Sequence, residues 1–305
     1  MIFEMSSNLP REVPVLFGPP FELTTLRTAG ADIRLRIGGN GPPLLLLHGF
    51  PQTHAMWHAV APALAAHYSL VIPDLRGYGE SAKPTTTDDH LPYSKRAMAI
   101  DMVDVMTALG HDRFFVAGHD RGARVTHRLC VDHPARVRKA CVMDIVPTHH
   151  IFTNTDQRLA TAYYHWFFLI QPDGLPERMI GRDPDYFLLE CLRRWSAPGM
   201  RFNELALAEY QRCYRNPRTI HAACEDYRAG ASIDLVHDAA DLDHKIDCPL
   251  LVLWGKQGFV NKAYDVLEVW RQRATQVQGQ TLDCGHFLPE EQPAAVSDAL
   301  IEFMR

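Results

Sequence analysis

The sequence lacks the signals of several protein classes. No apolar run approaches the roughly 20 residues of a membrane-spanning helix, and the longest, PPLLLLHGF (Pro42–Phe50), has the length of a strand. The first twenty residues show no basic stretch followed by an apolar one, so we expect no signal peptide. The net charge of -5 leaves no excess of Lys and Arg for a nucleic-acid surface. These absences indicate a cytoplasmic protein that binds neither membrane nor nucleic acid, with a small molecule as its partner.

Metal and redox motifs are missing as well. The chain has seven Cys residues, an odd number, and none lies in a C-x-x-C pair. This pattern favours buried thiols in a reducing compartment over a disulfide framework. The 16 His residues are scattered and include no H-E-x-x-H motif. We therefore expect no metal and no organic cofactor.

What the chain does have is an alternation of short apolar runs with helix-length amphipathic segments. Such an alternation predicts the α/β class, with a mostly parallel, doubly wound sheet covered on both faces. The predicted buried strands are PPLLLLHG, YSLVIPD, RFFVAGHD, KACVMDIVP and CPLLVLWG. ADIRLRIGG alternates polar and apolar residues and predicts an antiparallel strand at the edge of the sheet.

The alternation is interrupted once. Residues 148–244 are rich in aromatic side chains and short helical segments and contain no convincing buried strand. We interpret this stretch as a helical cap inserted into an α/β core of residues 23–147 and 245–305. Residues 1–22, which are rich in Pro, are predicted to form an N-terminal arm.

The segment GHDRG, residues 118–122, follows a predicted strand and precedes a predicted helix. This context and the two glycines match the strained strand-turn-helix elbow that usually reads G-x-S-x-G and carries a nucleophilic Ser. Here Asp120 occupies the position of the Ser. An ordinary junction with Asp120 as a helix N-cap is the alternative interpretation of these five residues alone.

Two later residues complete a catalytic set. His286 lies in the loop DCGHFLPEE before the last helix, where an elbow enzyme needs its base. No carboxylate occurs between Cys248 and Tyr264, the stretch that often supplies the acid, so another residue must orient the imidazole. Asp144 ends the preceding strand, at the edge of the sheet where ligands bind. We therefore predict Asp144 as the acid that holds the His286 tautomer.

The loop HGFP, which follows the first buried strand, predicts an oxyanion hole. The backbone N–H of Phe50 is the first expected donor, and the N–H of Arg121, directly after the nucleophile, is the second.

A carboxylate at the elbow indicates attack on a saturated carbon. A Ser attacking such a carbon would leave an ether, which water cleaves poorly. Asp120 would leave an ester, whose carbonyl can be attacked by water activated by His286. The leaving group is then a halide or an epoxide oxygen.

Two arginines favour a haloacid. Arg121 and Arg124 are three residues apart and share one face of the elbow helix. A guanidinium fork suits a carboxylate, so both are predicted to bind the substrate carboxylate. The alternative is an ordinary salt-bridged helix surface.

With these residues the chain resembles the fluoroacetate (haloacetate) dehalogenases of the α/β-hydrolase superfamily, from about residue 30 to the C-terminus. The resemblance is carried by LLLLHGFPQTHAMWH, PDLRGYGES, GHDRGAR, YHWFFLIQP, CEDYRAG and GHFLPEE. It implies the roles given above for Asp120, Asp144, His286 and the two arginines. It also implies a homodimer.

The resemblance further implies that His165, Trp166 and Tyr227, hereafter the halide trio, bind the leaving halide. Imidazole N–H, indole N–H and phenol O–H are hydrogen-bond donors, which a departing fluoride needs. From the sequence alone, residues such as His165 and Trp166 more often belong to cap-core packing.

The predicted reaction is hydrolysis of a short 2-haloacid, such as haloacetate to glycolate and halide. An epoxide hydrolase is the first alternative, since it also uses an Asp nucleophile. It needs two cap tyrosines, of which only Tyr227 is a candidate, and it leaves the arginines unexplained. A non-catalytic ligand receptor on the same scaffold is the alternative from another class.

Overall fold

The computed structural model describes residues 16–305, which form one eight-stranded sheet with helices around it. The strand order is β1-β2-β4-β3-β5-β6-β7-β8. The strands are β1 (Glu22–Arg27), β2 (Asp32–Gly38), β3 (Pro43–Leu47), β4 (Ser69–Pro73), β5 (Phe114–His119), β6 (Val137–Met143), β7 (Leu250–Gly255) and β8 (Val277–Leu282). All neighbours from β4 to β8 pair in parallel, whereas β2 is antiparallel to both β1 and β4. The prediction of a mostly parallel α/β sheet is confirmed.

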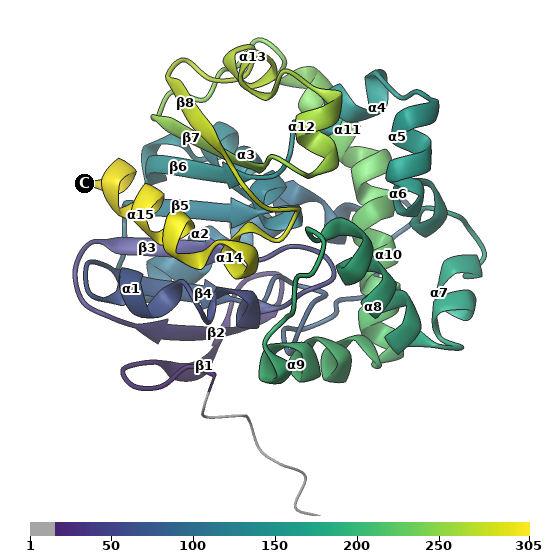
Figure 1. Cartoon of the computed structure of the whole chain (residues 1–305), viewed down its shortest axis with the longest axis horizontal. Helices are drawn as coiled ribbons and strands as arrows, with labels where there is room; N and C mark the ends of the chain where they lie inside the picture. Colours follow the sequence, from purple (N-terminus) through teal and green to yellow (C-terminus); the bar gives the residue numbers. More distant parts are fainter. Residues whose placement is uncertain (1–15) are drawn as a thin grey trace, which may run out of the picture.

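The helices fall into two groups (Figure 1). Those that accompany the sheet are α1 (Ala61–Ala65), α2 (Lys95–Ala108), α3 (Arg121–Asp132), α12 (Phe259–Ala263), α13 (Val266–Arg271), α14 (Leu288–Glu291) and α15 (Pro293–Met304). Those between β6 and β7 are α4 (Thr148–Thr153), α5 (Gln157–Ala162), α6 (Tyr164–Leu169), α7 (Leu175–Ile180), α8 (Pro184–Trp195), α9 (Glu204–Tyr214), α10 (Pro217–Ala231) and α11 (Ile233–Ala240). The second group, within the stretch predicted as a cap, gathers beside the carboxyl ends of the central strands.

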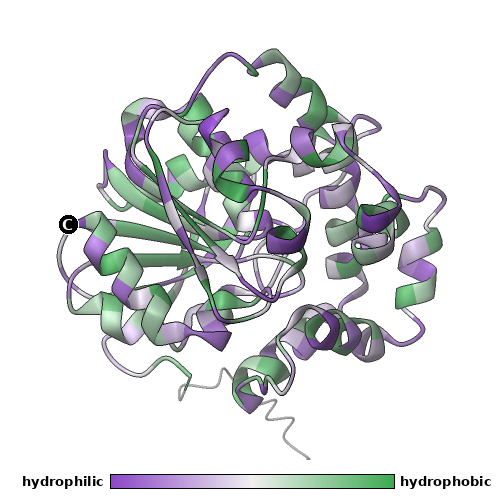
Figure 2. Cartoon of the chain, turned by 45° about the horizontal axis from the view of Figure 1, so that its top comes forward, coloured by the Kyte–Doolittle hydropathy of each residue, from purple (hydrophilic) through white to green (hydrophobic). Residues whose placement is uncertain are grey.

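The central strands form the core because both of their faces are covered. Every residue of β5 and β7 is buried, as continuous apolar runs predict for a parallel sheet between helices. Figure 2 shows the central strands as largely hydrophobic, whereas the surrounding helices carry both hydrophobic and hydrophilic residues.

Two expectations about the edges need correction. β2 is antiparallel, as predicted, but β1 pairs with its other side, so β1 is the edge strand. β8, at the opposite edge, was missed because its sequence VQGQTL is largely polar and its burial alternates.

The predicted N-terminal arm lies largely outside the described residues. Within residues 16–22, Phe17 is buried and contacts the Phe21 ring edge-on at 5.5 Å, and Glu22 already belongs to β1. Among residues 16–305 no helix combines the length and apolarity needed to cross a membrane.

Candidate active site

Asp120 lies in a tight, strained turn, which requires the strand before it and the helix after it to pack closely together. It joins β5 to α3 with φ 47° and ψ -114°, a conformation that costs a non-glycine residue free energy. A Cβ on Gly118 would approach the carbonyl oxygen of Gly122 to 2.4 Å, and one on Gly122 would approach that of His48 to 2.4 Å. These glycines let the strand and helix close tightly around the tip, which presents the Asp120 carboxylate beyond the sheet.

Asp144 follows the neighbouring strand in the same way. His119 and Met143, the last residues of β5 and β6, are paired in the sheet. The residues that follow them, Asp120 and Asp144, therefore lie side by side. Asp144 also has a positive φ, 52°. Its Oδ1 accepts the N–H of Gly255 at 2.9 Å, and its Oδ2 accepts His286 Nδ1–H at 2.6 Å. The structure thus brings the predicted acid and base together.

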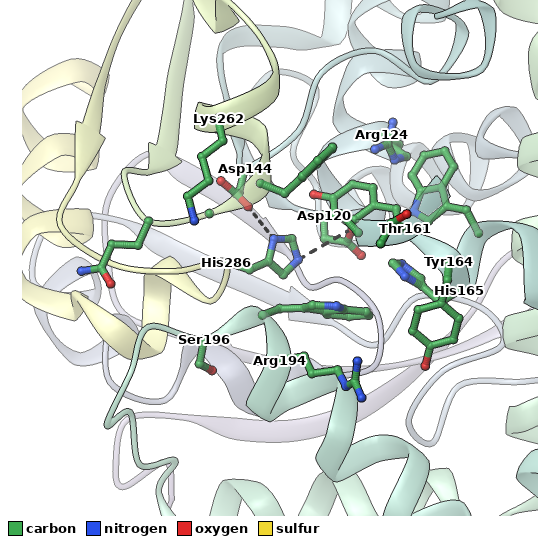
Figure 3. A pocket seen from close by; sticks show the side chains of 17 residues that line it. Asp120, Arg124, Asp144, Thr161, Tyr164, His165, Arg194, Ser196, Lys262 and His286 are labelled. Atoms are coloured by element: carbon green, nitrogen blue, oxygen red, sulfur yellow. Dashed lines mark hydrogen bonds and ion pairs between the residues drawn. The ribbon is translucent and has the colours of Figure 1, made fainter. Parts of the chain in front are cut away.

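His286 stands between the two carboxylates (Figure 3). Its Nε2 is 3.9 Å from Asp120 Oδ2, too long for a direct hydrogen bond. Burial by itself would lower the pKa of His286, but the hydrogen bond and charge of Asp144, aided by the charge of Asp120, raise it above its ordinary value. Burial alone would raise the pKa of Asp120, yet the nearby His286 and His119, together with Arg121 and Arg124, hold it below its ordinary value. Asp120, the predicted nucleophile, is therefore ionised.

The loop after β3 contacts the nucleophile as predicted from HGFP. The backbone N–H of Phe50 donates to Asp120 Oδ1 at 2.8 Å. His48 holds this loop in place, because its Nε2 accepts the N–H of Leu75 at 3.0 Å. The two oxygens of Asp120 thus differ: Oδ1 is bound by the loop, and Oδ2 faces His286. The Arg121 N–H stays a predicted second donor.

A cavity of about 380 Å³ opens above Asp120. Of the predicted site residues, those that line it are Asp120, Arg124, Asp144, His165, Trp166 and His286. Phe50, Arg121 and Tyr227 are not among the lining residues, but each contacts one of them: Phe50 and Tyr227 contact His165, and Arg121 lies over the Trp166 ring. Figure 3 shows Lys262 and Arg194 at the same cavity, so its lining carries further positive charge.

Arg124 is a buried cation without an anionic partner at close range. Its Nη1 donates to the carbonyl oxygen of Val146 and to Thr148 Oγ1, both at 3.0 Å, and its guanidinium lies 4.6 Å from the Trp166 ring. No carboxylate of residues 16–305 lies within 4.0 Å of it. Burial, and next the charge of Arg121, lower the pKa of Arg124 to about 10, so it remains charged at neutral pH.

Arg121, by contrast, forms an ion pair through two of its three guanidinium nitrogens. Its Nε and Nη2 donate to the two carboxylate oxygens of Asp226, on α10, at 2.8 and 2.7 Å. Only its Nη1 has no hydrogen-bond partner in the described chain. The two arginines predicted to bind the substrate carboxylate therefore differ in their surroundings: Arg121 has a carboxylate partner and Arg124 has none within 4.0 Å in the described chain.

The three aromatic members of the halide trio contact one another. The ring of His165 is 5.7 Å from that of Tyr227, and the ring of Trp166 is 5.9 Å from the same tyrosine. Burial lowers the pKa of His165 to about 3, so the imidazole is neutral, and its Nδ1 has no partner within residues 16–305. Burial raises the pKa of Tyr227, which keeps its O–H protonated. The trio therefore consists of neutral donors.

Three residues near the site were missed in the sequence. Trp195 lines the cavity, lies 4.4 Å from the His165 ring, and accepts the His286 N–H with its carbonyl oxygen at 2.8 Å. Glu291 binds the backbone N–H groups of residues 285, 287 and 197, which tie the His286 loop to the cap segment. Asp226 lies inside CEDYRAG, where two adjacent acids are both buried and nothing in the sequence shows which of them contacts Arg121.

Comparison with known proteins agrees with this architecture. A family model described as the alpha/beta hydrolase fold matches residues 42–293. The chain belongs to this family. It is 44% identical to a fluoroacetate dehalogenase from Burkholderia sp., over 93% of its own length and 94% of the relative's.

This hydrolase is also similar to two further proteins. A soluble epoxide hydrolase from Corynebacterium sp. strain C12 is 33% identical, with 87% of this chain and 91% of the relative covered. A crystal structure of an alpha/beta hydrolase from Nostoc sp. PCC 7120 superposes with a TM-score of 0.93 at 56% identity, covering 93% of this chain and 98% of that one.

Proposed function

We propose that this chain is a hydrolytic dehalogenase of short 2-haloacids, which converts a haloacetate, including fluoroacetate, to glycolate and halide. The observation that carries the proposal is the juxtaposition of an ionised Asp120 with Arg124, a buried cation that has no carboxylate within 4.0 Å in the described chain. The site thus offers a nucleophile for a saturated carbon and a charge for a carboxylate beside it. The 44% identity to a fluoroacetate dehalogenase supports the same assignment.

The proposed first step is displacement. The substrate carboxylate binds Arg124 and the free Nη1 of Arg121, which places its α-carbon over Asp120 Oδ2. Attack by Oδ2 forms the carbon–oxygen bond as the carbon–halogen bond breaks. The halide leaves with its electron pair toward the donors of the halide trio.

The proposed second step is ester hydrolysis. His286 Nε2 removes a proton from a water molecule, which attacks the Asp120 carbonyl carbon. The negative charge then develops on Oδ1, where the Phe50 N–H already donates at 2.8 Å. Collapse of the intermediate releases glycolate, which takes its proton from His286. Asp120 becomes a carboxylate again when the second proton of the water is lost to solvent.

Halide release is the direct test. The purified enzyme is incubated with fluoro-, chloro- and bromoacetate, and free halide is followed with an ion electrode. We expect release from at least one of the three with glycolate as the organic product. Absence of halide from all three, with diol formed from an epoxide, would reverse the assignment in favour of an epoxide hydrolase.

The epoxide alternative gains one structural feature. Tyr163 and Tyr164 line the cavity, so the cap holds further tyrosines besides Tyr227. An epoxide carries no charge, however, and would leave Arg124 buried without a counter-ion. The non-catalytic receptor is disfavoured because the Asp120–His286–Asp144 arrangement and the Phe50 N–H are assembled in working geometry. A homodimer and a cytoplasmic location remain predictions that accompany this function.

Replacing Arg124 should separate charged from neutral ligands. For Arg124→Ala we expect chloroacetate to bind about 10- to 150-fold more weakly, because a charge-assisted contact in a buried site contributes about 1.5–3 kcal/mol. Chloroacetamide, which has no charge, should bind nearly as before. Thr148→Val is the matched control, since it removes one hydrogen bond of Arg124 but leaves the charge. Equal losses for both ligands in Arg124→Ala would make Arg124 a structural residue.

The pH dependence of ester hydrolysis should report His286. Its imidazolium cannot accept a proton, so hydrolysis should slow as the pH falls. Asp144 raises the pKa of His286, and therefore Asp144→Asn should move the midpoint of this acid limb to lower pH while also reducing the rate. Decay of the preformed ester, followed by mass spectrometry over a pH series, measures both. A midpoint that stays in place would mean that Asp144 does not set the basicity of His286.

A further inference from the structure

Asp226 is a buried carboxylate at the centre of four contacts between the cap and the core. It is 0% exposed and accepts both Nε–H and Nη2–H of Arg121. Tyr78 O–H donates to its Oδ2 at 2.6 Å, and Lys95, the first residue of α2, donates to its Oδ1. The Asp226 carbonyl oxygen accepts a further N–H from Arg121 Nη2 at 2.7 Å. One residue of α10 therefore fixes a guanidinium that belongs to the elbow helix.

The rest of α10 restricts the same guanidinium from other sides. The Arg121 guanidinium lies over the ring of Tyr227, 4.2 Å from its centroid. One turn further along, a Cβ on Gly230 would approach Arg121 Nη2 to 3.2 Å, so the glycine leaves just enough room. Held in this way, Arg121 has a single unpaired nitrogen, Nη1. Its direction is set by the cap and not by the substrate.

The charges around Asp226 are balanced within the protein. Lys95 Nζ also binds Asp234, on α11, at 3.2 Å, so two cations, Arg121 and Lys95, face two carboxylates, Asp226 and Asp234. Arg121 consequently brings a hydrogen-bond donor to the site but no net charge. Arg124, one turn along α3, is not neutralised at close range.

We propose that Asp226 is a positioning residue for the reaction: it neutralises Arg121 and aims its Nη1 at the substrate carboxylate, leaving Arg124 to supply the charge. The inference rests on the proposed function, in which both arginines meet that carboxylate. In this division of labour, Arg124 determines how tightly the anion binds. Arg121, held by Asp226, determines the angle at which the α-carbon meets Asp120 Oδ2.

Asp226→Asn is the first test, because Asn has nearly the same shape but no charge. Arg121 loses its carboxylate partner, and the cluster gains one positive charge. Ester formation at saturating chloroacetate, measured as halide released in a single turnover, should slow by about 100-fold, the cost of a misplacement of roughly 1 Å. The half-saturating concentration should change far less, since the added positive charge opposes the loss of one donor.

Asp234→Asn is the matched control. It removes a buried carboxylate from the same cluster, and the same charge, but makes no contact with Arg121. Its rate of ester formation should stay close to that of the wild type. Equal slowing in both variants would reduce Asp226 to a structural ion pair. An unchanged rate in Asp226→Asn, or a loss confined to the half-saturating concentration, would also overturn the proposal.

A second variant and a crystal structure distinguish the proposed positioning role from a folding defect and from failure of the proposed function. If Asp226→Asn does not fold, the double variant Lys95→Met/Asp226→Asn restores the charge balance and should show the same slow ester formation, with wild-type speed as the overturning result. A crystal structure of the folded variant needs no turnover: the Arg121 guanidinium should leave its place, and a guanidinium that stays put would contradict the proposal. Absence of halide release by the wild type would instead refute the proposed function.

Discussion

His286→Asn, incubated with chloroacetate, is expected to gain the mass of one carboxymethyl group and to stop there. Displacement by Asp120 needs no base, since the carboxylate is already ionised. Hydrolysis of the resulting ester does need one, because water must lose a proton as it attacks. The variant should therefore complete one turnover of halide release and then hold the ester. Intact-mass spectrometry, followed by peptide mapping to residue 120, measures it.

Asp120→Asn is the control for this experiment. A neutral amide is a poor nucleophile, so this variant should release no halide and keep its mass. An unmodified mass for a folded His286→Asn that still binds chloroacetate would remove His286 from the hydrolytic step. Label on another residue would displace Asp120 as the nucleophile.

Trp166→Phe is expected to slow defluorination by about 10- to 1000-fold and dechlorination by less. The carbon–fluorine bond is strong and fluoride leaves poorly, so its departure depends on hydrogen bonds that strengthen in the transition state. Chloride needs less of this help. Phe keeps an aromatic ring against the Arg124 guanidinium, which lies 4.6 Å from the Trp166 ring, but lacks the indole N–H. Single-turnover rates with fluoroacetate and chloroacetate measure the difference.

Tyr227→Phe should show the same selectivity in milder form. Trp195→Phe is the matched control, since Trp195 also lines the cavity but lies outside the halide trio. It should affect both substrates alike. If Trp166→Phe also slows the two substrates by one factor, the trio packs the cavity or binds uniformly, and its role as a fluoride site is wrong.

The sequence was most informative about the buried strands and about the order of the candidate site residues along the chain. The buried strands were predictable because each is a continuous apolar run. Asp120 and Asp144 were found at the ends of two such runs, and His286 in the loop before the last helix. β8 escaped because an edge strand needs no such run, and β2 was misplaced because β1 carries no clear pattern. These are limits of any signal that depends on burial alone.

The unequal surroundings of the two arginines were not predictable. Their spacing on α3 gives both the same face, but which of them is neutralised depends on Asp226, 105 residues further along the chain. Such a pairing is decided by how the cap packs on the core. It is visible only when the distances are known.

Because the Phe50 N–H donates a hydrogen bond to Asp120 Oδ1, the two carboxylate oxygens are not equivalent in the proposed reaction. In the proposed cycle, Oδ2 leaves inside each glycolate, and the oxygen of water takes its place. Oδ1, which the oxyanion loop holds, is never exchanged as long as the carboxylate group does not rotate and interchange its two oxygens. In water enriched in oxygen-18, the first glycolate would be unlabelled and every later one labelled, while Asp120 would carry one heavy oxygen at most. The enzyme would thus consume one of its own atoms in every cycle and keep the neighbouring one permanently.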